Sequence, residues 1–367
     1  PATELGSTAV REALGRSAVE GADVDEVFLG CVLPAGLKQC PARQAAIGAG
    51  IPVSTGAVTV NKACGSGMQA TIFGYDSIVA GTNRVVVAGG LESMSNAPHL
   101  LPAGRKGTRL GATTLYDHMF MDGLEDAYTG RAMGTFAQET ADQRGLTREA
   151  MDAFAIESLA RAKAAIEDGS LKPETAPVTV KTRKGETVVE DDEQPHKAAV
   201  DKIPGLRPAF AKEGTITAAN SSSISDGASA LVLMSGSEAA RRGISGSAEL
   251  VAHARHSRAP EEFTLAPIGA IGKLLDKTGW SVDDVDLFEI NEAFAMVTML
   301  SMLDLGLPHE KVNIHGGACA QGHPIGSTGS RIIVSLMYAL KKTGGKRGIA
   351  ALCIGGGEAT AVAIELC

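Results

Sequence analysis

The chain carries one pattern twice, as Asp23-Val24-Asp25-Glu26-Val27-Phe28-Leu29-Gly30 and again as Asp284-Val285-Asp286-Leu287-Phe288-Glu289-Ile290-Asn291. In each half this pattern precedes a second short run rich in Val or Ile, expected as a strand, which begins at Val58 in the first half and at Lys311 in the second. A segment with helical periodicity and then a third apolar run follow in both halves. Short apolar runs that alternate with longer helix-period segments indicate βαβ units whose sheets are buried on both faces. The sequence therefore predicts an α/β fold made of two duplicated βαβ halves.

A segment of different composition separates the two halves. From about residue 95 to residue 217 charged residues become more frequent and prolines interrupt regular structure, although a helix is predicted over 148–167. The residues 226–234 predict a turn and a strand that rejoins the first half. We expect a first half of residues 1–94 plus 218–245, an inserted subdomain of residues 95–217, and a second half of residues 246–367.

Composition narrows the classes of function. The 367 residues are 44% hydrophobic with a net charge of −8, and no dense Lys/Arg cluster is present, which argues against nucleic acid as the main ligand. No apolar run is long enough to predict a membrane span. The six cysteines are sparse, so a reducing, cytoplasmic location is expected. A helical pattern that begins almost at Pro1 predicts that further residues precede it.

The first candidate site residue is Cys64, in the segment Asn61-Lys62-Ala63-Cys64-Gly65-Ser66-Gly67-Met68. It lies where a strand-like run passes into a helix, so the helix N-terminus is expected to lower the thiol pKa from about 8.5 to about 7 or less. The nearby glycines let a ligand approach the backbone, and the Cys64 amide can face a developing oxyanion. The alternative is a buried structural cysteine.

A general base and a second thiol are predicted in the C-terminal half. His323 lies between Gly322 and Pro324 in a turn-rich frame, and a neutral imidazole near pH 7 can take a proton from a thiol. Cys353 ends an apolar run before three glycines, which makes the Gly355 amide a candidate oxyanion donor. Taken alone, His323 also fits a loop histidine and Cys353 a small apolar residue at a strand end.

Asn291 ends the repeated pattern of the second half, before Glu292, and fits either a site residue or the N-cap of a following helix. A zinc site is a competing interpretation, since Cys319 and His323 are four residues apart. No Cys-x-x-Cys pair supports it, and we expect no metal. Phosphate-binding and dinucleotide-binding glycine motifs are also missing, so nucleotide hydrolysis and hydride transfer lack their usual signals.

Five motifs in this order resemble those of the thiolase family over nearly the whole chain. They are Cys64-Gly65-Ser66-Gly67-Met68, Gly89-Gly90-Leu91-Glu92-Ser93-Met94-Ser95, Asn291-Glu292-Ala293-Phe294, Gly322-His323-Pro324-Ile325-Gly326 and Cys353-Ile354-Gly355-Gly356-Gly357. The segments Tyr116-Asp117-His118-Met119 and Asp122-Gly123-Leu124 are most similar to the acetyl-CoA acetyltransferase branch. The resemblance implies a layered α-β-α-β-α core with an inserted loop subdomain.

The resemblance also implies a ping-pong Claisen condensation of two acetyl-CoA to acetoacetyl-CoA and CoA, and the reverse thiolysis. Cys64 would carry the acyl group and His323 would take its proton, while Cys353 would deprotonate the second acetyl-CoA. Asn291 would hold a water that forms one oxyanion hole with His323, and the amides of Cys64 and Gly355 would form the other. No cofactor is expected besides coenzyme A as substrate and product.

Coenzyme A contacts carry over from the family to six positions: Leu124, Met133, Phe210, Ala218, Ser222 and Phe294. Core packing is the alternative for these residues, above all for Leu124 and Phe294. Phe263 lies where many bacterial members have a Met-Gly pair, so it is the candidate determinant of acyl preference. Ala132 and Ser223 also depart from the common pattern, and the strand that opens the family fold is missing before Pro1.

The family further implies a homo-oligomer, and the segment 98–115 resembles the loop that joins dimers into tetramers. We therefore expect a homotetramer in fatty acid metabolism, with no nucleic acid or membrane partner. The first alternative function is a 3-ketoacyl-CoA thiolase acting on longer or branched chains. An alternative of another class is a non-catalytic acyl-CoA or lipid-binding relative, and a redox or zinc-binding protein is the last.

Overall fold

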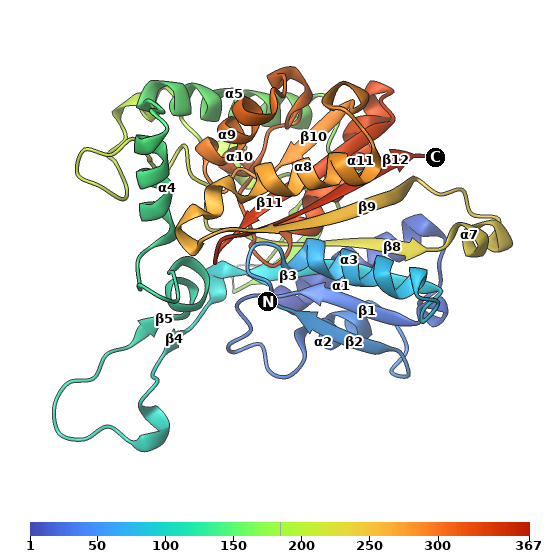
Figure 1. Ribbon diagram of the computed structural model, residues 1–367. Coiled ribbons are helices and arrows are strands. Elements are labelled where there is room, and N and C mark those ends of the chain that lie inside the picture. Colours follow the sequence, from blue (N-terminus) through green and yellow to red (C-terminus); the bar gives the residue numbers. More distant parts are fainter. Residues whose placement is uncertain (184) are drawn as a thin grey trace.

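Two four-stranded sheets form the centre of the computed structural model, which describes residues 1–183 and 185–367 (Figure 1). The first sheet has the order β2-β1-β3-β8 and the second the order β10-β11-β12-β9. The strands of the first sheet are β1 (Glu26–Gly30), β2 (Gly56–Val60), β3 (Val85–Ser93) and β8 (Asp226–Met234). Those of the second are β9 (Ala248–Ser257), β10 (Leu287–Ile290), β11 (Arg347–Ile354) and β12 (Glu358–Leu366).

The two sheets repeat one topology. β1 pairs in parallel with β3, which pairs antiparallel with β8, and β10 pairs in parallel with β11, which pairs antiparallel with β12. β3, β10 and β11 are buried along almost their whole length, as their mainly apolar sequences predict. The α/β fold with duplicated halves is therefore confirmed.

The halves differ at the strand next to β10. β2 pairs with β1 over five residues, but its counterpart in the second half is a single bridge between Phe288 and Val312. The next residue, Asn313, has a left-handed backbone with φ 48°, and Gly316 has φ 76°. Such angles turn the chain out of the extended conformation, so the run 311–314 does not continue as a strand.

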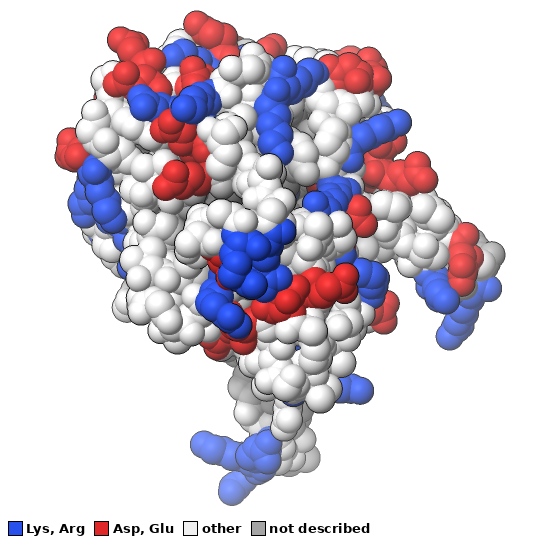
Figure 2. Space-filling model, turned by 90° about the vertical axis from the view of Figure 1, so that its right-hand side faces the viewer, with Lys and Arg blue, Asp and Glu red and all other residues white. Residues whose placement is uncertain are grey.

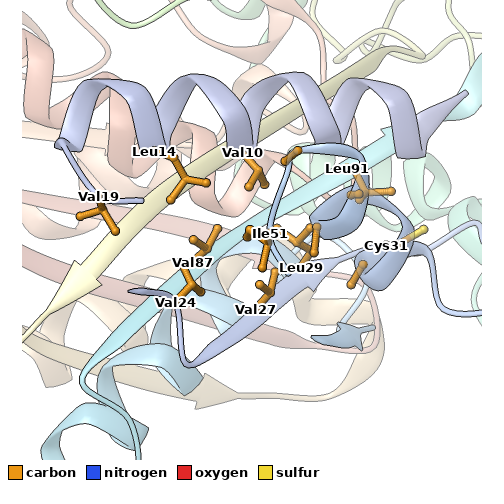
Figure 3. Close-up of a cluster of buried hydrophobic side chains, with 14 of the residues drawn as sticks. Val10, Leu14, Val19, Val24, Val27, Leu29, Cys31, Ile51, Val87 and Leu91 are labelled. Carbon is orange, nitrogen blue, oxygen red and sulfur yellow. The ribbon is translucent and has the colours of Figure 1, made fainter. Parts of the chain in front are cut away.

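Helices complete five layers. α3 (Ser66–Val79) and α11 (Thr328–Thr343) pack against each other between the sheets. α1 (Ala2–Ser17) and α2 (Pro41–Gly48) cover the outer face of the first sheet, where Val10, Leu14 and Leu29 meet in its core (Figure 3). α8 (Ala266–Thr278) and α9 (Ala295–Leu305) cover the outer face of the second sheet. This agrees with the α-β-α-β-α order that the resemblance implies.

Most of the other elements lie between β3 and β8. The predicted helix over 148–167 forms as α5 (Arg148–Glu167), which packs against α9. A long loop, residues 101–115, extends away from the body of the molecule (Figure 1). Besides short 3-10 helices, the remaining elements are β4 (His99–Leu100), β5 (Tyr116–Asp117), a π-helical turn (Phe120–Leu124), α4 (Met133–Gln143), β6 (Val178–Thr182), β7 (Gly185–Val189), α6 (Glu193–Lys197), α7 (Gly236–Arg242) and α10 (Ala318–Gln321).

In the part of the chain that the structure describes, no helix is both long enough and apolar enough to cross a membrane. All six cysteines are free thiols.

Candidate active site

The candidate residues lie at the ends of buried elements that converge between the two sheets. Cys64 precedes α3, and His323 lies between α10 and α11. Asn291 directly follows β10, and Cys353 is the next-to-last residue of β11. Ligands of such layered sheets bind beyond strand ends, so these positions fit a binding site.

Cys64 is held by a strained turn. Ala63, directly before it, has φ 42°, an unusual angle for a residue with a side chain, and Gly65 N donates to the carbonyl oxygen of Lys62 at 3.0 Å. Cys64 is half-buried, and the backbone amides of Gly355 and of Cys64 itself point at its sulfur. The two amides that the sequence nominated for an oxyanion hole therefore meet at this sulfur.

The expected depression of the Cys64 pKa is wrong. Burial raises the pKa of the Cys64 thiol to about 11, and the amides of Gly355 and Cys64 lower it only in part. Removal of solvent outweighs the helix N-terminus here, because a thiolate loses its hydration when it is buried. The resting nucleophile is a thiol, and it needs a base.

His323 supplies an unprotonated ring nitrogen. Its Nδ1 lies 2.7 Å from Thr328 Oγ1, and that hydroxyl donates to the carbonyl oxygen of Pro324 at 3.0 Å. A hydroxyl has one proton to donate, so it accepts from Nδ1–H, and Nε2 is left as the acceptor. Burial lowers the pKa of His323 to about 3, which keeps the ring neutral, and Nε2 is buried without a partner. Thr328 is a site residue that the sequence analysis missed.

Asn291 also presents unpaired polar atoms. The residue is 2% exposed, and neither its side-chain nitrogen nor its side-chain oxygen has a hydrogen-bond partner in the described part of the chain. The N-cap interpretation is wrong, since α9 begins at Ala295 and is capped by Phe294. A buried amide without partners costs free energy unless water or a ligand completes it, so Asn291 fits a binding role.

The second thiol lies beside the first. Burial raises the pKa of Cys353 well above its ordinary value, and the neighbouring Cys64 raises it further. After Cys353 the chain turns through Gly356 and Gly357, with φ 93° and φ 86°. A Cβ on Gly357 would lie 2.5 Å from the carbonyl oxygen of Arg258, so these angles and this space require glycine.

The loop that contains His323 packs directly against backbone atoms of glycines in the first half. A Cβ on Gly30 or on Gly90 would lie 2.4 Å or 2.0 Å from the carbonyl oxygen of Gly326. His323 N also donates to Ser225 Oγ at 3.1 Å. The site is therefore assembled across the two halves, and the glycines of β1 and β3 permit the contact.

Apolar side chains form two walls around the thiols. Phe294 contacts Phe210 and Phe263 edge to face, with ring centroids 6.0 Å and 6.4 Å apart. Met133 and Cys353 belong to the same cluster. The second wall contains Val32, Leu33, Met94, Met119 and Ile325, with Cys64 and Leu124 packed against it.

The structure brings most of the nominated coenzyme A residues to these walls. Leu124 lies in one wall, and Met133, Phe210, Phe263 and Phe294 lie in the other. Ser222 donates from both its amide and its hydroxyl to the carbonyl oxygen of Ala293, next to Phe294. Ala218 differs, since it is exposed and belongs to neither wall.

Cys319, which with His323 formed the candidate zinc pair, contacts Glu292. Its amide donates to Glu292 Oε2 at 3.1 Å, and Glu292 also accepts from Ser158 and Asn313. Among residues 1–183 and 185–367, no group of three or more His, Cys, Asp or Glu side chains is arranged to hold a metal ion.

Comparisons with known proteins show which chains this one is similar to. The chain is 46% identical over 367 residues to the acetyl-CoA acetyltransferase of Chromobacterium violaceum, covering 100% of this chain and 94% of that protein. It is also 46% identical to the acetyl-CoA acetyltransferase of Schizosaccharomyces pombe, with coverage of 100% and 93%. The solved structure of a thiolase from Ascaris suum in complex with coenzyme A is similar, with a TM-score of 0.94, 40% identity, and coverage of 100% of this chain and 94% of that chain.

Two family models divide the chain between them. The thiolase N-terminal domain matches residues 1–237, and the thiolase C-terminal domain matches residues 244–366. Together with the full-length similarity, they establish that the chain belongs to the thiolase family.

Proposed function

We propose that this protein is an acetyl-CoA C-acetyltransferase, which condenses two acetyl-CoA into acetoacetyl-CoA and CoA and catalyses the reverse thiolysis. One observation carries the proposal. The half-buried thiol of Cys64, with two backbone amides aimed at its sulfur, lies beside the buried thiol of Cys353. Among the described residues, His323 Nε2 and the side-chain amide of Asn291 are buried polar groups without a hydrogen-bond partner, which supports their roles as base and water ligand. The relatives named acetyl-CoA acetyltransferase support the choice of substrate.

In the first step Cys64 Sγ attacks the thioester carbon of acetyl-CoA. His323 Nε2 takes the proton of the Cys64 thiol. When the CoA thiolate leaves, it takes this proton from His323. The negative charge that develops on the carbonyl oxygen is held by hydrogen-bond donors that are already in place, which is the larger part of such catalysis. Because burial disfavours both thiolate and imidazolium in the resting site, we place the proton transfer with the attack and not before it.

In the second step His323 takes the proton of the Cys353 thiol, and the resulting Cys353 thiolate takes a proton from the methyl group of a second acetyl-CoA. The resulting carbanion attacks the acyl carbon on Cys64, a carbon–carbon bond forms, and the Cys64 thiolate leaves and takes the proton from His323. Asn291 would bind the water that, with His323, stabilises the enolate oxygen. Pantetheine is narrow and largely apolar, so the walls around Leu124 and Phe294 suit it, with Met133, Phe210, Ala218 and Ser222 as further contacts.

The first experiment is CoA-dependent thiolysis of acetoacetyl-CoA, measured beside a series of longer and branched 3-ketoacyl-CoA substrates. Fast cleavage confined to the four-carbon substrate is expected. Broad activity would favour a 3-ketoacyl-CoA thiolase, the second candidate, and would argue against a restriction of chain length by the buried ring of Phe263. No activity from folded protein would favour a non-catalytic acyl-CoA-binding relative.

The roles of the two thiols separate by labelling with radioactive acetyl-CoA. Cys64→Ser is expected to abolish acyl-enzyme formation. Cys353→Ser is expected to retain acylation but to lose carbon–carbon bond formation, since its first step is intact. Equal labelling of wild type and Cys64→Ser would contradict the assignment of the nucleophile.

We further propose a homotetramer of the cytoplasm that serves fatty acid metabolism and uses no cofactor besides coenzyme A. The exposed loop 101–115 supports the tetramer, because Leu110 and Leu115 are exposed and Arg105, Lys106 and Arg109 give it a basic tip. Figure 2 shows Lys and Arg side chains at the end of the part that projects below the body. Light scattering that finds a monomer at micromolar concentration would refute the oligomer.

A further inference from the structure

Glu92 is a buried carboxylate that the reaction steps above do not use. It is the next-to-last residue of β3, and 0% of its surface is exposed. A carboxylate is almost never fully buried unless other groups satisfy it. Its environment therefore needs a physical reason.

Backbone amides from both halves satisfy this carboxylate. Glu92 Oε2 accepts from Val32 N at 2.9 Å and from Gly326 N at 3.0 Å, and Oε1 accepts from Leu33 N at 3.2 Å. The Cys31 thiol lies 3.8 Å from Oε1. Val32 and Leu33 follow β1 in the first half, whereas Gly326 belongs to the second half, three residues after His323. One side chain thus joins two loops that are far apart in the sequence.

The same two loops supply a wall of the site. Val32, Leu33 and Ile325 form the cluster against which Cys64 packs. The carbonyl oxygen of Gly326 lies over the backbone of Gly30 and Gly90, so the loop that contains His323 packs closely against the first half. The carboxylate of Glu92 also packs closely against Gly326, since a Cβ on Gly326 would lie 2.7 Å from Glu92 Oε2.

We infer that Glu92 is a positioning residue that holds the loop of His323 against the loop of Val32 and Leu33, and so sets the base and the apolar wall around Cys64. An ionised carboxylate suits this task because both of its oxygens accept and neither donates. A glutamine in its place would turn an N–H group toward at least one backbone N–H. The inference rests on the proposed function in that it takes His323 as the base.

Glu92 also affects Cys64 electrostatically, which provides an independent measurement. The negative charge of Glu92 is one of the causes that raise the pKa of Cys64. Burial raises the pKa of Glu92 itself to about 7, although the amides of Val32, Leu33 and Gly326 lower it. Above about pH 8 the carboxylate is therefore ionised, and its removal should make the Cys64 thiol more acidic.

Two substitutions of Glu92 separate the effect of its charge from the effect of its side-chain length. For Glu92→Gln we expect the rate of acetyl transfer from acetyl-CoA to fall by roughly tenfold or more, because a misplaced base loses near-attack geometry. We also expect the midpoint of Cys64 alkylation by iodoacetamide to move to lower pH, read by mass spectrometry of the Cys64 peptide. Glu92→Asp keeps the charge but is too short for three amides, so acylation should fall while the alkylation midpoint stays.

Controls keep the test decisive if Glu92→Gln does not fold. Gly326→Ala leaves Glu92 intact but crowds its contact, so it should lower acylation without moving the alkylation midpoint. Glu174→Gln, which removes a buried carboxylate bound to Ser335 of α11, should change neither.

Wild-type acylation and an unchanged alkylation midpoint in folded Glu92→Gln would overturn the inference, as would a loss of thermal stability without either effect. Normal acylation in both Glu92→Asp and Gly326→Ala would also overturn it. Failure of the wild type to accept an acetyl group would refute the proposed function instead, and the alkylation arm does not depend on acetyl transfer.

Discussion

The hydrogen bond between Thr328 and His323 decides which ring nitrogen can act. Thr328 Oγ1 donates to the carbonyl oxygen of Pro324 and therefore accepts from Nδ1 of His323. This fixes the ring orientation and the tautomer with Nε2 unprotonated. In a buried site, the wrong tautomer would place a proton where the base needs a lone pair.

Loss of the Thr328 hydroxyl is expected to slow the chemical step. In Thr328→Val the shape is kept, but nothing accepts from Nδ1–H, so the ring can exchange tautomers. We expect kcat for thiolysis to fall by roughly tenfold or more with KM changed much less, the pattern of a general base that is out of place. Thr328→Ser, which restores the hydroxyl, should recover most of the rate. An unchanged kcat in the valine variant, with ¹⁵N spectra that still show Nδ1–H, would contradict this role.

The residues of the site could be predicted from the sequence only where their immediate sequence neighbours form a recognisable motif. Cys64, His323 and Cys353 each lie in a glycine-rich frame, and the structure brings these three side chains and Asn291 to neighbouring element ends. Thr328 could not be found, because its importance depends on a hydrogen bond to a ring five residues away. The error on the pKa of Cys64 has a similar cause, since the sequence shows the start of a helix but not the loss of solvent.

At the scale of elements, helices and strands could be predicted where the local sequence pattern alone determines the structure. The helix expected over 148–167 is α5, and the strand expected over 226–234 is β8. The thiolase fold and family, expected from motif order, are confirmed by the full-length similarity. The run 311–314 failed to form a strand because Asn313 adopts a left-handed backbone, which apolar patterning does not reveal.

The contact between the turn after α5 and α11 makes stability depend on pH. Glu174 Oε1 accepts from Ser335 Oγ at 3.1 Å, while its Oε2 is buried without a partner. Burial raises the pKa of Glu174 from 4.5 to about 7. A carboxyl group with a raised folded-state pKa stabilises the protein below its unfolded pKa, and this contribution is lost as pH rises through the folded pKa. The window for Glu174 is therefore about pH 4.5 to 7.

Glu174→Gln should remove this dependence. Relative to wild type, the variant should gain stability between pH 5 and pH 8, by up to ~3 kcal/mol for a shift of this size. Thermal unfolding of both proteins across that range isolates the effect, because their difference cancels the histidines that titrate in the same window. A difference that is constant with pH would show that Glu174 ionises normally.

At the scale of the whole molecule, the two halves meet through α3 and α11 at the point where both helices begin beside the site. A Cβ on Gly329 of α11 would lie 2.5 Å from Met68 N and 2.8 Å from Met68 Cβ, whereas a Cβ on Gly67 of α3 would lie 2.8 Å from Ser330 N. Backbone thus packs on backbone between the sheets. This contact sets the spacing between the loop of Cys64 and the loop of His323.

Gly329→Ala should consequently impair stability and catalysis together. The methyl group has no space, so the halves must separate slightly, and we expect the free energy of unfolding to fall by about 1–3 kcal/mol. Gly15→Ala is the matched control, since Gly15 also lies within a helix but a Cβ there meets nothing within 4 Å. It should stabilise the protein by about 0.5–1 kcal/mol, because alanine is the better helix former. Urea unfolding at one protein concentration measures both, since oligomers unfold in a concentration-dependent way. If Gly329→Ala retained wild-type kcat despite a lower urea midpoint, the spacing of α3 and α11 would matter for folding but not for the alignment of base and nucleophile.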